Sequence, residues 1–248
     1  RPKIVPLTNK NIYSSSLNIS KSLNLLEEDH CLNIMPLFHI HGLIAIIASS
    51  MKSGASVCAS NGFNALKFLE LAKSEKITWY SGVPTMHQTI MLRAEKNLEL
   101  AKNLNLRLVR SSSASLPPAV FEKLNKVFNC PVIEAYGMTE ATHQMTSNPL
   151  PPKKQKAGFV GIPAGPEVAI MNENNQIMKN GEVGEICIKG NNVTTGYENN
   201  PEANKTSFSD GWFRTGDQGF FDKDGYLKIS GRLKEIINKG GEKISPLE

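Results

Sequence analysis

Long apolar runs and paired cysteines are both lacking in this sequence. Its most apolar stretch, residues 43–51, is far shorter than the roughly 20 residues that a membrane-spanning helix needs, so we expect no membrane span. No C-x-x-C pair occurs among the four cysteines, Cys31, Cys58, Cys130 and Cys187, which lie far apart. This spacing favours reduced core thiols in an intracellular protein over a disulfide framework or a zinc site.

Runs of like charge are lacking too. The 28 Lys and Arg residues exceed the 23 Asp and Glu residues by only five, and the lysines are scattered along the chain. This pattern predicts a solvated surface or an anionic small ligand, and we expect no nucleic-acid partner. The sequence begins at Arg1 and not at Met, so we expect the natural chain to start earlier.

Strand-like and helix-like segments alternate through residues 32–148. Helices are expected to begin at Pro84 and after a cap at Ser115. The expected strands are 77–80, 106–109 and 132–135. Such alternation predicts an α/β fold, a parallel sheet covered by helices, in a subdomain of residues 1–150. Ligands bind such sheets beyond the carboxyl ends of the strands, which nominates residues 111–114 and 136–140.

Short strands and tight turns follow the proline-rich residues 149–152. Asp224 and Gly225 lie between two strand-like runs and predict a hairpin. We therefore expect residues 151–230 to form a small β-rich, barrel-like subdomain.

The segment from Tyr136 to Glu140 combines an aromatic ring, a glycine, a hydroxyl and a carboxylate. We expect a strand to end here and a helix to open with Thr139 and Glu140. The ring suits a nucleotide base, the hydroxyl suits a phosphate, and the carboxylate suits Mg²⁺. A capped helix with an exposed tyrosine explains the same five residues equally well.

Two further polar residues suit a nucleotide. Asp217 follows Gly216 in an expected turn, where its carboxylate can accept hydrogen bonds from ribose hydroxyls. Arg232 can reach ribose or phosphate. Taken singly, each is more often an ordinary surface residue.

In their order along the chain, these motifs resemble those of the adenylate-forming enzymes, which include acyl-CoA synthetases, luciferases and peptide-synthetase adenylation domains. The resemblance covers essentially the whole chain. Arg1-Pro2-Lys3 is similar to the end of the family's phosphate loop, whose glycines are not in this sequence. The other matching segments are 36–42, 111–114, 136–140, 214–217, 231–232 and 240–243.

The resemblance implies a site for ATP or AMP, with Mg²⁺ held by Glu140. It implies catalytic roles for His39, at the gate between acyl pocket and thiol tunnel, and for Thr139 and Glu140. Lys234 occupies the family's hinge position. The residues implied to contact the nucleotide are Lys3, Ser112, Ser113, Ala114, Glu134, Ala135, Tyr136, Thr139, Asp217 and Arg232.

A C-terminal domain is also implied. Residues 231–248 would form the hinge and the start of that domain, with Gly240 and Gly241 leaving room for the pantetheine arm of coenzyme A. The family's adenylation lysine would lie beyond Glu248. We therefore expect this chain alone to bind nucleotides weakly and to turn over poorly or not at all.

The reaction implied is the joining of a carboxylic acid to coenzyme A through an acyl-adenylate. The residues after Glu140 look like those of the oxalate–CoA ligase group of plants and fungi. On the expected helix His143 shares a face with Glu140, so it would project into the acyl site. With Ser113, Ser115 and Gly137 it would favour a second carboxylate over an alkyl chain.

Three alternatives stay open. His143 can simply pack or hydrogen-bond nearby. The acid can be 4-coumarate or a fatty acid instead of oxalate. The chain can also be a nucleotide-binding homologue without catalysis. The resemblance implies a location in the cytoplasm or the peroxisome.

Overall fold

The computed structural model describes residues 3–235, 237–239 and 242–244, and the side chains up to residue 235. A seven-stranded sheet in the order β2-β1-β3-β4-β5-β6-β7 forms its larger part, parallel from β2 to β5 and antiparallel beyond. The α/β fold with a largely parallel sheet is therefore confirmed. The strands are β1 (His30–Asn33), β2 (Ser56–Ala59), β3 (Trp79–Gly82), β4 (Leu108–Ser111), β5 (Val132–Met138), β6 (His143–Ser147) and β7 (Ile162–Pro163).

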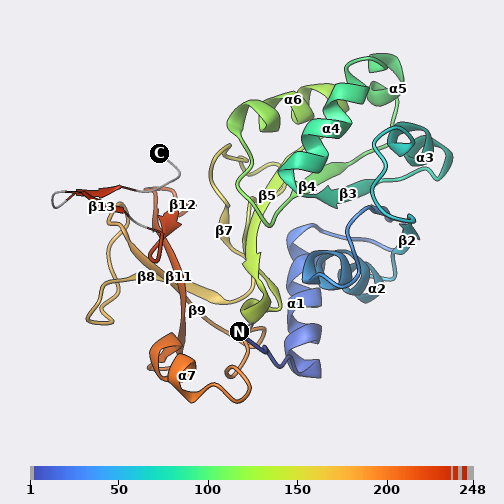
Figure 1. Cartoon of the computed structure of the whole chain (residues 1–248). Helices are drawn as coiled ribbons and strands as arrows, with labels where there is room; N and C mark the ends of the chain where they lie inside the picture. Colours follow the sequence, from blue (N-terminus) through green and yellow to red (C-terminus); the bar gives the residue numbers. More distant parts are fainter. Residues whose placement is uncertain (1–2, 236, 240–241, 245–248) are drawn as a thin grey trace.

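Helices cover both faces of this sheet (Figure 1). One face carries α1 (Asn9–Ser22), η1 (His41–Ala48) and α2 (Ser49–Lys52), which bury Ile19 and Ile44 against Trp79. The other face carries α3 (Phe68–Ser74), α4 (Pro84–Ala94), α5 (Leu98–Lys102) and α6 (Pro118–Phe128). Burial of apolar side chains fixes α3, α4 and α6 to the sheet. The buried face of α1 is mostly polar, with Asn11, Ser15, Ser16 and Ser20 beside Ile19.

The two expected helix starts have different outcomes. Pro84 occupies the first turn of α4, as predicted, where its lack of an N–H costs no hydrogen bond. The predicted cap at Ser115 is wrong: Pro117 precedes α6 and no side chain caps the helix. The fixed φ of the consecutive prolines starts this helix instead.

An antiparallel sheet follows, in the order β10-β11-β9-β8 with β12 on β11. It curls beside the first sheet, as expected of a barrel-like unit (Figure 1). The predicted hairpin at Gly225 joins β11 to β12, and the Asp222 carboxylate accepts the Asp224 and Tyr226 amides within it. The remaining elements are β8 (Glu167–Met171), β9 (Gly184–Lys189), α7 (Pro201–Ser207), β10 (Phe208–Ser209), β11 (Trp212–Phe221), β12 (Leu227–Arg232), β13 (Ile237–Lys239) and β14 (Glu242–Ile244).

The two sheets share one apolar cluster. Tyr136 and Met145 of the first sheet pack with Ile170, Ile186 and Phe213 of the second. The two sheets therefore meet through side chains from β5 and β6, with the carboxyl end of β5 between them. All four cysteines are free, and none of the helices in the described residues is both long and apolar enough to cross a membrane.

Candidate active site

A cavity of about 720 Å³ opens between the two sheets, beyond the carboxyl ends of β4 and β5. These two strands are neighbours and parallel, so the loops that follow them meet at one edge of the sheet. Gly240 and Gly241 lie outside the described residues. Of the remaining site residues inferred from the sequence, all except Ser112 line the cavity: Lys3, His39, Ser113, Ala114, Ser115, Glu134, Ala135, Tyr136, Gly137, Thr139, Glu140, His143, Asp217, Arg232 and Lys234.

Ser112 and Glu134 hold the loop after β4 in place. Ser112 is fully buried, and its Oγ donates to the Ala135 carbonyl at 2.8 Å. Glu134 Oε1 accepts the Leu116 amide at 2.9 Å, while Oε2 has no partner among the described residues. Burial raises the pKa of Glu134 to about 7, and backbone hydrogen bonds oppose the rise only in part.

Tyr136, Asp217 and Arg232 form a chain of contacts from β5 across β11 to β12. The Tyr136 hydroxyl donates to the Asp217 carboxylate, and Arg232 Nε lies 3.3 Å from Asp217 Oδ1. Burial raises the pKa of Asp217, although both partners oppose the rise. Tyr136 is only 9% exposed, so the alternative of an exposed tyrosine is wrong.

No α-helix opens at Thr139, so the prediction of a helix that carries both Glu140 and His143 is wrong. A single 3-10 turn, η2 (Thr139–Ala141), is followed by a reversal through Thr142 (φ 50°) and His143 (φ 96°) into β6. Antiparallel pairing of β5 with β6 provides hydrogen-bond partners for the backbone N–H and C=O groups that would otherwise bond within a helix. Gly137 allows this close pairing because it has no side chain: an added Cβ would lie 1.7 Å from the His143 carbonyl oxygen.

His143 reaches the cavity from a strand and not from a helix face. It is 2% exposed, its ring centroid lies 5.2 Å from that of His41, and its Nδ1 has no partner among the described residues. His41 contacts Ser113 Oγ at 3.0 Å and Ser81 Oγ at 2.6 Å. Burial, aided by the charge of Arg110, holds the pKa of both imidazoles well below the ordinary value.

Arg110 supplies the positive charge behind these histidines. It is fully buried on β4, and Nη2 donates to Gln144 Oε1 at 3.1 Å. Its Nε has no partner, and no described Asp or Glu pairs with it. Burial lowers its pKa to about 9. Neither Arg110 nor His41 was predicted from the sequence to belong to the site. An arginine inside the apolar run of β4 could have indicated a buried functional charge.

Lys3 and Glu140 both contact Tyr197, a residue that was not predicted from the sequence to belong to the site. Tyr197 donates its hydroxyl to Glu140 Oε1 at 2.8 Å, and Lys3 Nζ lies 4.2 Å from its ring centroid. No group of three or more potential metal ligands occurs among the described residues. One carboxylate nevertheless fits Mg²⁺, which commonly takes its other ligands from water and substrate phosphates.

His39 and Lys234 are both exposed where they line the cavity. The Nδ1 of His39 accepts the His41 amide at 3.0 Å, which fixes the loop before η1.

Comparison with known proteins adds to this geometry. A family described as AMP-binding enzyme matches residues 1–198. The chain belongs to this family. AMP-binding enzymes among its relatives include the oxalate–CoA ligases of Arabidopsis thaliana, 51% identical over 100% of this chain and 49% of the relative, and of Saccharomyces cerevisiae, 49% identical over 100% and 45%. The chain thus spans about half the length of the curated relatives it matches.

A solved structure of the family gives the same fold. O-succinylbenzoate coenzyme A synthetase of Bacillus subtilis, in complex with ATP and magnesium ion, superposes with a TM-score of 0.87 at 32% identity, over 99% of this chain and 50% of that one.

Proposed function

We propose that this chain forms the nucleotide- and acid-binding part of an ATP-dependent acid–CoA ligase that acts on oxalate. The observation that carries the proposal is the buried cluster of Arg110, His41 and His143 beside Ser113, of which His143 and Ser113 line the cavity. Two of the relatives that are about 50% identical are oxalate–CoA ligases, which supports the same substrate.

The cluster suits a second carboxylate. An unpaired buried guanidinium is costly, so a bound anion nearby would stabilise it. The unpartnered Nδ1 of His143 offers a further polar contact to such a ligand. An alkyl or aryl acid would leave the Nδ1 of His143 buried without a partner, which argues against fatty acids and 4-coumarate. With His143 almost fully buried where it lines the cavity, this part of the cavity suits a short acid.

The opposite end of the cavity suits the nucleotide. We assign the adenine to the surface formed by Tyr136 and Ala135, the ribose to Asp217 with Arg232, and the phosphates to Lys3 and Thr139. Mg²⁺ held by Glu140 would neutralise phosphate charge.

These residues act by positioning two substrates for reaction. An oxygen of the acid attacks the α-phosphorus of ATP and pyrophosphate leaves; the thiol of coenzyme A then displaces AMP from the acyl-adenylate. His39 would gate the thiol path, Lys234 would lie at the hinge, and Gly240 with Gly241 would accommodate the pantetheine arm. Location in the cytoplasm or peroxisome stays a prediction.

Pyrophosphate–ATP exchange by the full-length protein tests the proposal, with oxalate, malonate, 4-coumarate and octanoate as the acids. We expect the fastest exchange with oxalate, and its loss by about tenfold or more in His143→Ala, because a buried polar contact to a charged ligand is removed. His30→Ala, a histidine outside the cavity, is the control.

Each other outcome has a definite meaning. If none of the four acids supports exchange, the result would favour a nucleotide-binding homologue without catalysis. Preference for octanoate or 4-coumarate would overturn the choice of oxalate, as would unchanged oxalate turnover in His143→Ala.

A further inference from the structure

We infer that Tyr197 is a positioning residue whose hydroxyl orients the Glu140 carboxylate for Mg²⁺, while its ring holds the Lys3 ammonium for phosphate. The inference rests on the proposed function and adds to it a residue from the β-rich part of the chain. Its basis is the contact of one side chain with two opposite charges that line the same cavity.

Tyr197 contacts the two charges with different parts of its side chain. Glu140 Oε1 accepts the Tyr197 hydroxyl at 2.8 Å, and Lys3 Nζ lies over the ring, 4.2 Å from its centroid. The hydroxyl thus holds the carboxylate and the ring holds the ammonium, although the two opposite charges line the same cavity and attract each other. Because the hydroxyl engages Oε1, the second carboxylate oxygen stays available to a cation.

The ring itself is firmly anchored. Tyr197 is 5% exposed and packs against Phe213, with ring centroids 6.4 Å apart. The side chain of Asn204 binds the backbone of Tyr197 twice. Its Oδ1 accepts the Tyr197 amide at 2.7 Å, and its Nδ2 donates to the Tyr197 carbonyl at 2.9 Å.

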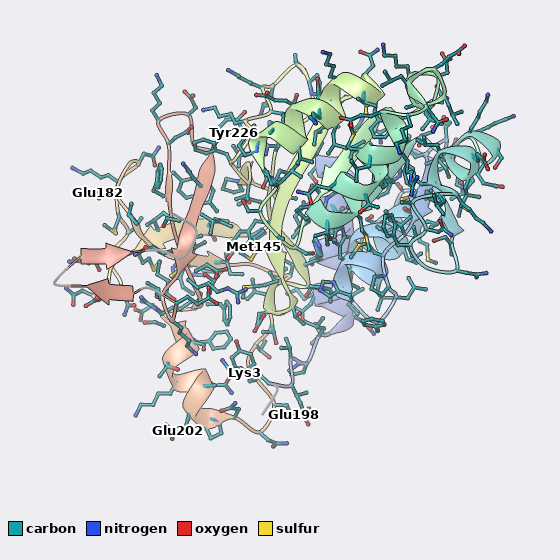
Figure 2. All side chains as sticks on the ribbon, turned by 45° about the horizontal axis from the view of Figure 1, so that its top comes forward. Lys3, Met145, Glu182, Glu198, Glu202 and Tyr226 are labelled. Carbon is teal, nitrogen blue, oxygen red and sulfur yellow. The ribbon has the colours of Figure 1, made fainter. Side chains whose placement is uncertain are left out.

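The same loop also fixes the backbones of both charged partners. Thr194 donates its amide to the Glu140 carbonyl at 2.7 Å and its hydroxyl to the Pro6 carbonyl at 2.8 Å. The Glu198 amide donates to the Ile4 carbonyl at 3.0 Å. Figure 2 shows Lys3 beside Glu198 accordingly. Tyr197 therefore lies in a loop that sets the positions of Glu140 and Lys3 together.

The test is the Mg²⁺ dependence of oxalate-dependent pyrophosphate–ATP exchange by the full-length protein. Tyr197→Phe keeps the ring and removes the hydroxyl. We expect its half-saturating Mg²⁺ concentration to rise about tenfold, as for loss of a hydrogen bond to a charged group, with a much smaller change in rate at saturating Mg²⁺. In a Glu140→Gln background, Tyr197→Phe should change the half-saturating Mg²⁺ concentration little further, because the carboxylate that the Tyr197 hydroxyl positions is gone.

Tyr226→Phe is a matched control. Tyr226 is also buried, donates its hydroxyl to the Lys154 carbonyl at 2.6 Å and carries Lys156 over its ring at 4.4 Å. It does not line the cavity, and Figure 2 places it far from Lys3. A loss of stability alone would affect both variants, whereas we expect only Tyr197→Phe to change the Mg²⁺ requirement.

Two failures are distinguishable. If the wild-type protein exchanges with oxalate and Tyr197→Phe keeps the wild-type Mg²⁺ half-saturation, the inference is overturned while the proposed function stands. If none of the acids supports exchange by the wild-type protein, the proposed function is overturned and the inference with it.

Discussion

Glu134 illustrates how burial sets the state of a single group in the site. It is 1% exposed, and its pKa is raised to about 7. The folded protein therefore holds its proton up to a higher pH than the unfolded chain does. Stability from this group is complete below the ordinary pKa of about 4.5 and is lost as the pH rises through about 7.

Replacing Glu134 with Gln should remove that loss. As the pH rises from 5 to 8, the wild-type protein should lose unfolding free energy from this group, whereas Glu134→Gln should not. The difference in unfolding free energy between the two should therefore change across this range, in favour of Glu134→Gln, by on the order of 3 kcal/mol for a shift of this size. Urea unfolding across this pH range measures the change. Glu122→Gln, an exposed change on α6, should track wild type. A constant difference between Glu134→Gln and wild type over the range would contradict the account.

Sequence reasoning found the site residues that belong to local motifs and missed those defined by contact. Tyr136, Glu140 and Asp217 lie in short ordered motifs, and the structure places all three on one cavity. Arg110 and Tyr197 gain their meaning only from partners such as Gln144 and Glu140, 34 and 57 residues away in the chain. Contacts of that sequence separation are not encoded in a local pattern.

At the scale of elements, the reversal from β5 to β6 decides where the acid-binding groups lie. The helix expected after Met138 is replaced by a tight turn, because β6 can pair with β5 only where a residue without a side chain lets the backbones approach. A helix and a sharp turn begin with the same residue types, so local propensity did not separate them.

Gly137→Ala should therefore disturb both stability and acid binding. Its Cβ would overlap the His143 carbonyl oxygen, and overpacking of this kind costs about 1–3 kcal/mol or more. We expect lower unfolding free energy and a higher KM for oxalate. Gly82→Ala is the control, since its Cβ would meet its nearest neighbour at an ordinary 3.4 Å. Equal behaviour of the two variants would contradict the proposed role of the close approach.

At the scale of the whole molecule, the site depends on two sheets that are held together. The alternation of strands and helices predicted the first sheet, and the turn at Gly225 predicted part of the second. The boundary proposed near residue 150 remains a proposal, and β7 continues the first sheet to Pro163. Strand pairing across such a boundary depends on tertiary packing that periodicity does not contain.

Asn192 is one of the residues that join the two parts. It is 1% exposed, and its Nδ2 donates to the Ala141 carbonyl at 2.8 Å and to the Gln144 carbonyl at 3.0 Å. Asn192→Ala would leave both carbonyls without this donor, so we expect a loss of about 2 kcal/mol or more of unfolding free energy. Exposed Asn174→Ala should change it by less than about 0.5 kcal/mol. Similar values for the two variants would show that this junction contributes little.

A crystal structure of the protein with ATP, Mg²⁺ and oxalate tests the central claim most directly. We predict that the AMP moiety will lie in the cavity between β5 and β11, contacting Tyr136 and Asp217, with oxalate beside His143. Nucleotide bound at another surface, or oxalate bound away from His143, would contradict the claim that one cavity holds both substrates.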